Sequence, residues 1–194
     1  MERACLGGLR LLVQHATGNS VLCELVTGIG AQTPRISCND MVSVDRSLDE
    51  VYNLERYIDA QAGGPGEGWF RIVGSPAEAR EVIRDGKLAV VLGIEISNLF
   101  DCLLTPPEGF ERCTEADVLA ALDEYPARGV RAIFPVYKFD NGFSAGDGHG
   151  SIIELGNFVN PGHDSSFEAP SEAPSSVFDS GEVSFGGLNQ PRDD

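Results

Sequence analysis

The chain has 194 residues and is strongly acidic, with 14 Lys and Arg residues, 30 Asp and Glu residues and a formal net charge of -16. Such a charge repels the phosphate backbone of nucleic acids, so the sequence excludes a nucleic-acid function. No apolar run approaches the roughly 20 residues of a membrane-spanning helix. The first residues lack the basic stretch and apolar core of a signal peptide, so we expect a soluble chain without a targeting segment.

Apolar runs typical of buried strands alternate along the chain with amphipathic helices. The expected elements, in chain order, are a strand at 9–14, helices at 19–26 and 47–61, a strand at 69–73, a helix at 76–84, a strand at 87–94, a helix at 116–125 and a strand at 131–136. Capping boxes mark two of the helix starts, Ser47 with Glu50 and Thr114 with Asp117. This order of strands and helices predicts right-handed crossovers and a parallel sheet.

The two ends of the chain differ in composition. Residues 141–194 are rich in Gly, Pro and Ser and show few helix or strand signals, whereas 1–140 carry all the expected elements. We therefore expect an α/β fold of partial (β/α)8 barrel units over 1–140, with the helices outside the sheet, and an irregular acidic excursion or disordered tail over 141–194. A complete barrel usually takes about 250 residues, so this chain would form part of one. A partial barrel exposes two strand edges, which predicts self-association.

Glu95 is the first candidate for chemistry. It ends the apolar run from Lys87 to Ile94, which is typical of a strand buried on both faces. A charged carboxylate is costly to bury without a partner, so Glu95 is expected either at the solvated mouth of the sheet or on a cation. The carboxyl ends of parallel strands are also where (β/α)8 enzymes place their active sites. A solvated carboxylate without a function is the alternative.

The five cysteines show neither C-x-x-C spacing nor histidines at zinc-finger spacing. Cys102 and Cys113 bracket one turn-rich loop, and Cys23 and Cys38 bracket another. Two disulfides are therefore expected, with Cys5 left over, and they favour a secreted or periplasmic location. Five free thiols in a cytosolic protein are the alternative.

Two passages resemble the membrane dipeptidases, metallopeptidases of the amidohydrolase superfamily. They are Gly93-Ile-Glu95 at a strand end, and the run Leu-Ala-Ala-Leu-Asp-Glu-Tyr-Pro-Ala-Arg-Gly-Val-Arg at 119–131 with the strand that follows it. The similarity spans roughly residues 9–141 and is clearest over 87–136. It implies a (β/α)8 barrel in which Glu95 bridges two zinc ions and the next strand ends in a zinc-binding histidine. The implied substrate is a dipeptide or a related amide.

Several of the implied metal ligands are replaced or missing. Tyr137 stands where the resemblance implies the histidine, and a phenol is a poor zinc ligand beside an imidazole. The family's His-x-Asp pair and its later histidine and aspartate are absent, so the chain looks like an interior segment of a larger barrel. His15, just past the first expected strand, is a further candidate metal ligand, and Asp140 and Asn141 are expected to line the mouth with Tyr137.

Two other histidines lie in the Gly- and Pro-containing segment near the carboxyl end. Asp147-Gly-His149 offers a second option for binding a metal, and His163 follows in a loop. No nucleophile elbow, P-loop or dinucleotide-binding motif is present, so neither nucleophilic catalysis nor nucleotide binding has support.

The sequence leaves two hypotheses about function. The first is a metal-dependent hydrolase of dipeptides or related amides, with zinc as the cofactor of the full-length parent and with weak or no activity in this chain. The second is a non-catalytic, secreted binding or structural protein on a degenerate barrel scaffold, which Tyr137 favours. Under the second hypothesis the chain holds no cofactor.

Overall fold

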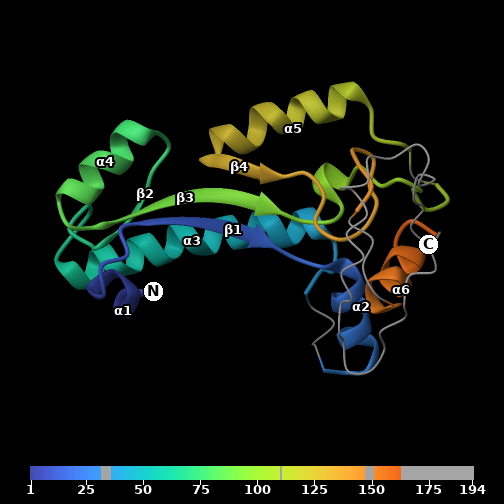
Figure 1. Ribbon diagram of the computed structural model, residues 1–194, viewed down its shortest axis with the longest axis horizontal. Helices are drawn as coiled ribbons and strands as arrows, with labels where there is room; N and C mark the ends of the chain where they lie inside the picture. Colours follow the sequence, from blue (N-terminus) through green and yellow to red (C-terminus); the bar gives the residue numbers. More distant parts are fainter. Residues whose placement is uncertain (32–35, 110, 147–150, 163–194) are drawn as a thin grey trace, which may run out of the picture.

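The computed structural model describes residues 1–31, 36–109, 111–146 and 151–162 (Figure 1). The elements in chain order are α1 (Glu2–Leu6), β1 (Leu11–Thr17), α2 (Ser20–Gly28), α3 (Asp40–Ala62), β2 (Phe70–Ile72), α4 (Pro76–Arg84), β3 (Leu88–Glu95), the 3₁₀ helix η1 (Leu99–Asp101), α5 (Glu115–Ala127), β4 (Val130–Phe134) and α6 (Ser151–Val159). The chain thus alternates strands and helices over most of its described length.

β3 is the centre of a four-stranded parallel sheet. On one side it pairs with β1 over its length, from Ala89 opposite Leu11 to Glu95 opposite Thr17. On the other side it pairs with β2 near its start and with β4 near its end. The expected parallel arrangement of the strands near 9–14, 87–94 and 131–136 is confirmed, and the sheet is open in the part of the chain that the structure describes.

Helices cover both faces of the sheet, so the expectation that the helices all lie outside it is wrong for α4. Successive side chains of a strand point to opposite faces, and β3 accordingly contributes to two cores. Leu92 and Ile94 are fully buried in the larger core with residues of α3 and α5. Ala89 packs in the smaller core with residues of α4, and Val91 packs against it. α3 and α5 therefore cover one face, and α4 covers the amino-terminal part of the opposite face.

The remaining part of that opposite face is not covered by any of the described residues. Because successive side chains of a strand point to opposite faces, this face carries Leu11, Val13 and His15 of β1 and Glu95 of β3. The side chains of Leu11 and Val13 are 51% and 48% exposed. An apolar sheet face of this kind is rarely left open to water.

The start of α3 differs from the expected helix start at Ser47. The helix begins seven residues earlier at Asp40, where the side chain of Asn39 accepts a hydrogen bond from the Val42 N–H. Ser47 lies inside the helix, and its hydroxyl donates to the Ser43 carbonyl at 2.8 Å. A serine in a helix interior often makes this bond to the preceding turn, so the apparent capping box at Ser47 and Glu50 was a wrong prediction.

Two strand boundaries also shift. β1 begins and ends later than the predicted strand at 9–14 and includes His15, because Ala16 packs in the core after it. β4 ends at Phe134 rather than at residue 136. Pro135 follows at once, and a proline has no N–H to continue a ladder of hydrogen bonds. Tyr137 therefore lies three residues beyond the strand rather than at its end.

The remaining helix starts agree with the sequence. Ser75 accepts from the Glu78 N–H at the start of α4, and Thr114 and Asp117 form the complete capping box of α5. The end of α5 is held against α3, because the Tyr125 hydroxyl donates to Asp45 at 3.2 Å and the Tyr52 hydroxyl donates to the Arg128 carbonyl at 2.9 Å. None of the described helices is long and apolar enough to cross a membrane.

Helix α6 corrects the prediction of an irregular segment from Asn141 onward. A glycine at position 156 weakens the helix signal of this stretch, but tertiary packing requires it. A Cβ at Gly156 would lie 2.5 Å from the Phe139 ring. Asn157 of the same helix accepts from the Asp140 N–H at 2.8 Å. The part of the predicted tail at 163–194 lies outside the described residues.

Candidate functional site at the carboxyl end of the sheet

The best-defined polar pair in the described part of the sheet joins β1 and β3. His15 Nδ1 lies 3.1 Å from Glu95 Oε2. Glu95 is the last residue of β3, and His15 faces Gly93, two residues before it, so both side chains emerge on the same face of the parallel sheet. The side chains are 27% and 30% exposed, which leaves the pair accessible to a small molecule.

Gly93 makes this contact possible. A Cβ at position 93 would lie 2.5 Å from His15 Cδ2, 2.9 Å from His15 Nε2 and 3.1 Å from the Ala132 carbonyl oxygen. The imidazole therefore occupies the space that a side chain at 93 would take. From there it reaches along β3 to Glu95. The sequence identified Gly93 only as part of a motif, whereas the structure shows that it provides the space for the ring.

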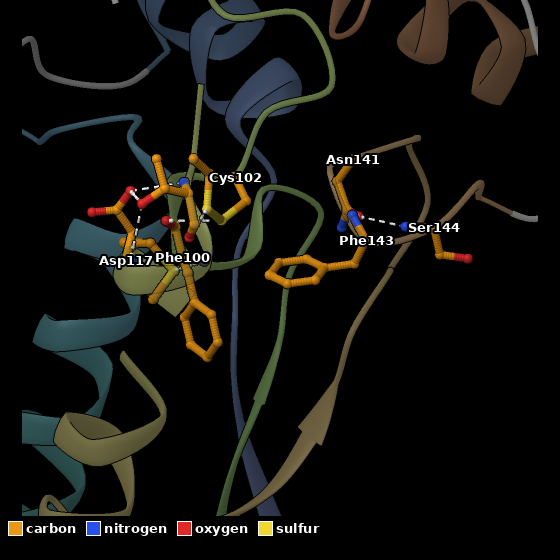
Figure 2. The surroundings of a disulfide bond; sticks show 9 residues. Phe100, Cys102, Asp117, Asn141, Phe143 and Ser144 are labelled. Carbon is orange, nitrogen blue, oxygen red and sulfur yellow. Dashed lines mark hydrogen bonds between the residues drawn. A yellow bond between two sulfur atoms is a disulfide. The ribbon is translucent and has the colours of Figure 1, made fainter. Parts of the chain in front are cut away.

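The other residues expected at the mouth serve the loops around it. Asn141 is buried, and its side-chain amide donates to the carbonyls of Ser97 and Pro135 at 2.8 Å each. It thereby joins the chain segments that follow β3 and β4. Its side-chain oxygen accepts from the N–H groups of Phe143 and Ser144, as Figure 2 shows for the tight turn at this position.

Asp140 and Tyr137 have partners of their own. Asp140 is buried, and its carboxylate accepts from the Gly146 N–H at 2.6 Å and from the Asn157 side chain at 3.4 Å. The Tyr137 ring lies 4.9 Å from the ammonium group of Lys138. The Tyr137 ring thus contacts the side chain of the neighbouring Lys138, and the Asp140 carboxylate binds the backbone of the loop that contains Gly146. The prediction that Glu95 lies directly beside these two residues remains a prediction.

Both expected disulfides are formed. Cys23 is bonded to Cys38 and Cys102 to Cys113, whereas Cys5 is a buried free thiol. The Cys102–Cys113 bond anchors the loop after β3, next to the turn at Asn141 (Figure 2). Disulfides persist in oxidising compartments, so the two bonds are consistent with an extracellular location.

The sequence did not reveal a buried polar cluster at this end of the sheet. Asp40 Oδ2 accepts from the Asn98 N–H at 3.1 Å. The Asn98 side chain exchanges hydrogen bonds of 3.0 Å with Asn160 and donates to Ser20. Burial raises the pKa of the Asp40 carboxyl, although the bond from Asn98 opposes the shift. The cluster connects α2, α3 and the residue after α6, and no local sequence pattern signals contacts so distant in the chain.

A cavity of about 470 Å³ lies next to His15, between β1 and α3. Its lining includes Gln14, His15 and Thr17 of β1 and Arg46 and Glu50 of α3. The cavity follows the edge of β1 that does not pair with β3. It provides room for a ligand or for another chain segment at this edge.

The described residues provide too few protein ligands for a pair of zinc ions. Each zinc ion of a catalytic site usually takes about three protein ligands. No group of three or more His, Cys, Asp or Glu side chains suited to a metal occurs among the described residues. Of the expected zinc ligands, His15 and Glu95 are in contact. This set does not fit a bridged zinc pair. Asp147, His149 and His163 lie outside the described residues.

Comparison of the chain with protein-family models, with curated proteins and with solved structures gave no match. The interpretation of the site therefore rests on its own geometry and chemistry.

Proposed function

We propose that this chain carries part of the active site of a dipeptidase-like, metal-dependent hydrolase that acts on dipeptides or related amides. The observation that supports the proposal is the contact of His15 with Glu95 at the carboxyl end of a parallel sheet. This end of a parallel α/β sheet is where active sites are usually found. In this proposal the fold is a segment of a (β/α)8 barrel.

Glu95 and His15 are the contribution of this chain to the zinc site. A bound zinc ion would supply an activated water and polarise the amide carbonyl. Two donors are too few for the zinc pair that the resemblance implies, so this chain has weak activity or none. The remaining donors belong to the full-length parent.

A zinc titration of the purified chain by calorimetry, with dipeptide hydrolysis measured in parallel, tests this proposal. We expect weak zinc binding that Glu95→Gln and His15→Asn both abolish. The matched control is Glu81→Gln, because Glu81 is an exposed carboxylate on α4, and it should leave zinc binding unchanged. Tyr137→His should strengthen zinc binding, since it restores the imidazole that the resemblance implies.

Two results would contradict the proposal. Zinc binding that persists unchanged in Glu95→Gln would show that this pair is not a metal site. Two tightly bound zinc ions per chain would show that the chain is not a partial site. The donors would then come from residues such as Asp147 and His149.

The alternative is a non-catalytic, secreted binding or structural protein on the same scaffold. The position of Tyr137 favours it, because the ring lies against Lys138 where the resemblance implies a histidine ligand. The two disulfides fit the secreted location. This alternative predicts that none of the zinc-site substitutions changes zinc binding, and that Tyr137→His has no effect.

A further inference from the structure

We propose that the cavity between β1 and α3 binds a small linear zwitterion, whose carboxylate pairs with Arg46 and whose ammonium group pairs with Glu50. The ligand is an unbranched ω-amino acid or a short peptide of the same length. The proposed contacts do not involve the His15–Glu95 pair, and they require neither zinc nor hydrolysis.

One face of α3 forms the polar wall of this cavity. Ser43, Arg46, Ser47 and Glu50 all belong to the lining. Their spacing of three and four residues places them side by side on a helix. The Ser47 hydroxyl already donates to the Ser43 carbonyl at 2.8 Å. The Ser43 hydroxyl makes no hydrogen bond with the described residues, so it can donate to a ligand.

The two charged side chains of this wall are available to a ligand. Within the described part of the chain, neither the Arg46 guanidinium nor the Glu50 carboxylate has an ion-pair or hydrogen-bond partner. Arg71, by contrast, is paired with Glu55. A basic residue that precedes an acidic one by four positions is also the less favourable order for a pair within a helix. Because the two free charges have opposite signs, they suit a ligand that carries both.

The separation of Arg46 and Glu50 selects the length of the ligand. Four residues of an α-helix rise about 6 Å along its axis. An extended dipeptide spans roughly 7 Å, and δ-aminovalerate has as many bonds between its charged groups as glycylglycine. An α-amino acid carries both groups on a single carbon atom, so its charges lie too close together to match the two residues.

The remaining lining suits the middle of such a ligand. Leu48 and Leu92 are buried apolar residues of the lining, and methylene groups can be buried against them. Among the described strands β1 pairs with β3 alone, so the backbone groups of its other edge are open to the amide of a dipeptide. The cavity volume of about 470 Å³ is in the range of small-molecule sites.

Calorimetric titration of the full chain with δ-aminovalerate, with a chelator present, tests the site. Valerate lacks the ammonium group and pentylamine lacks the carboxylate, so each can make one of the two charged contacts. We expect both to bind about tenfold more weakly than δ-aminovalerate. Norvaline, an isomer with both charged groups on one carbon, should be weaker by a similar factor. If δ-aminovalerate binds no more tightly than these three compounds, the proposal is overturned.

Two substitutions locate the ligand in the cavity. Arg46→Gln should weaken δ-aminovalerate by about tenfold and leave pentylamine unchanged, whereas Glu50→Gln should weaken δ-aminovalerate and leave valerate unchanged. The matched control is Arg56→Gln, because Arg56 is an exposed residue of the same helix outside the lining. Unchanged affinity for δ-aminovalerate in Arg46→Gln or in Glu50→Gln would overturn the assignment.

Glycylglycine distinguishes the two sources of the ligand. Tighter binding than that of δ-aminovalerate would identify a dipeptide that also uses the edge of β1, and equal or weaker binding would identify an ω-amino acid. Both results support the site. The titrations exclude zinc, so this proposal can fail while the zinc site holds, and the zinc site can fail while this proposal holds.

Discussion

Asp59 shows how a single carboxylate fixes a glycine-rich loop. Its two oxygens accept hydrogen bonds from the N–H groups of Gly66 and Gly68 at 2.9 Å. Nη1 of the Arg71 guanidinium lies 2.8 Å from each of the same two oxygens. Glu55 binds the same guanidinium at 3.1 Å. The loop after α3 is thereby connected to β2. The backbone bond from Gly66 and the bond from Arg71 lower the pKa of Asp59 from 3.8 to about 2.

This pKa shift predicts a pH dependence of stability. The carboxyl is more acidic in the folded state, so the unfolded state binds more protons between about pH 2 and 4. The stabilisation by Asp59 is complete above this window and is lost as the pH falls through it. Denaturant unfolding at several pH values should show this loss, and Asp59→Asn should reduce it. The control Asp123→Asn, at an exposed position on α5, should retain the pH dependence.

Single residues also mark where sequence reasoning succeeded. Glu95 was expected at the accessible end of a buried strand, and it is there with a 30% exposed side chain. His15 was expected near the same mouth, and it contacts Glu95 directly. The function of Gly93 could not be predicted, because the ring that fills its space comes from a strand almost 80 positions away.

At the scale of elements, the start of α3 distinguishes the residue that caps the helix from a serine inside it. Ser47 was the predicted N-cap, but Asn39 is the residue that accepts a bond from a backbone N–H at the helix start. Asn39→Ala should therefore reduce the free energy of unfolding by about 1 kcal/mol, and the lost bond to Asp101 adds to this effect.

Ser47→Ala is the matched control for this cap. It replaces a hydroxyl that only bonds back to Ser43, so we expect little change or a slight stabilisation. Denaturant unfolding of the two variants checks the prediction. A larger loss for Ser47→Ala than for Asn39→Ala would place the helix start at the later position.

The disulfides predict both a thiol count and a stability difference. The denatured, non-reduced chain should have one titratable thiol, which is Cys5. The bonds close loops with sequence separations of 15 and 11 residues, and each should stabilise the fold by roughly 3 kcal/mol. Unfolding of Cys102→Ser/Cys113→Ser and of Cys23→Ser/Cys38→Ser measures the two contributions. Five titratable thiols would show that the bonds do not form in the isolated protein.

At the scale of the molecule, the open sheet predicts association. Among the described residues, β1 pairs with β3 alone, which leaves its other edge open for pairing with another chain. The exposed side chains of Leu11 and Val13 lie on the same strand. We expect sedimentation or light scattering to show a mass that rises with protein concentration. Salt should favour association, because it screens the repulsion between chains of charge -16.

Val13→Lys tests whether this surface is responsible. A charge in the middle of an open strand face disfavours pairing, so the variant should be monomeric at concentrations at which the unmodified chain associates. Leu119→Lys is the control, since Leu119 is equally apolar and 56% exposed but lies on α5. Loss of association in both variants would point to general solubility rather than to this sheet face.

Local patterns in the sequence determined the approximate strands, the caps of α4 and α5 and the cysteine pairs, because each depends on residues close together in the chain. The alternation of strands and helices then predicted the parallel order. The tertiary structure decided the rest. Only long-range pairing places α4 and α3 on opposite faces, seats the His15 ring on Gly93 and holds α6 through Phe139 and Asn157. These contacts join residues that are distant in the sequence, so local propensity carries no information about them.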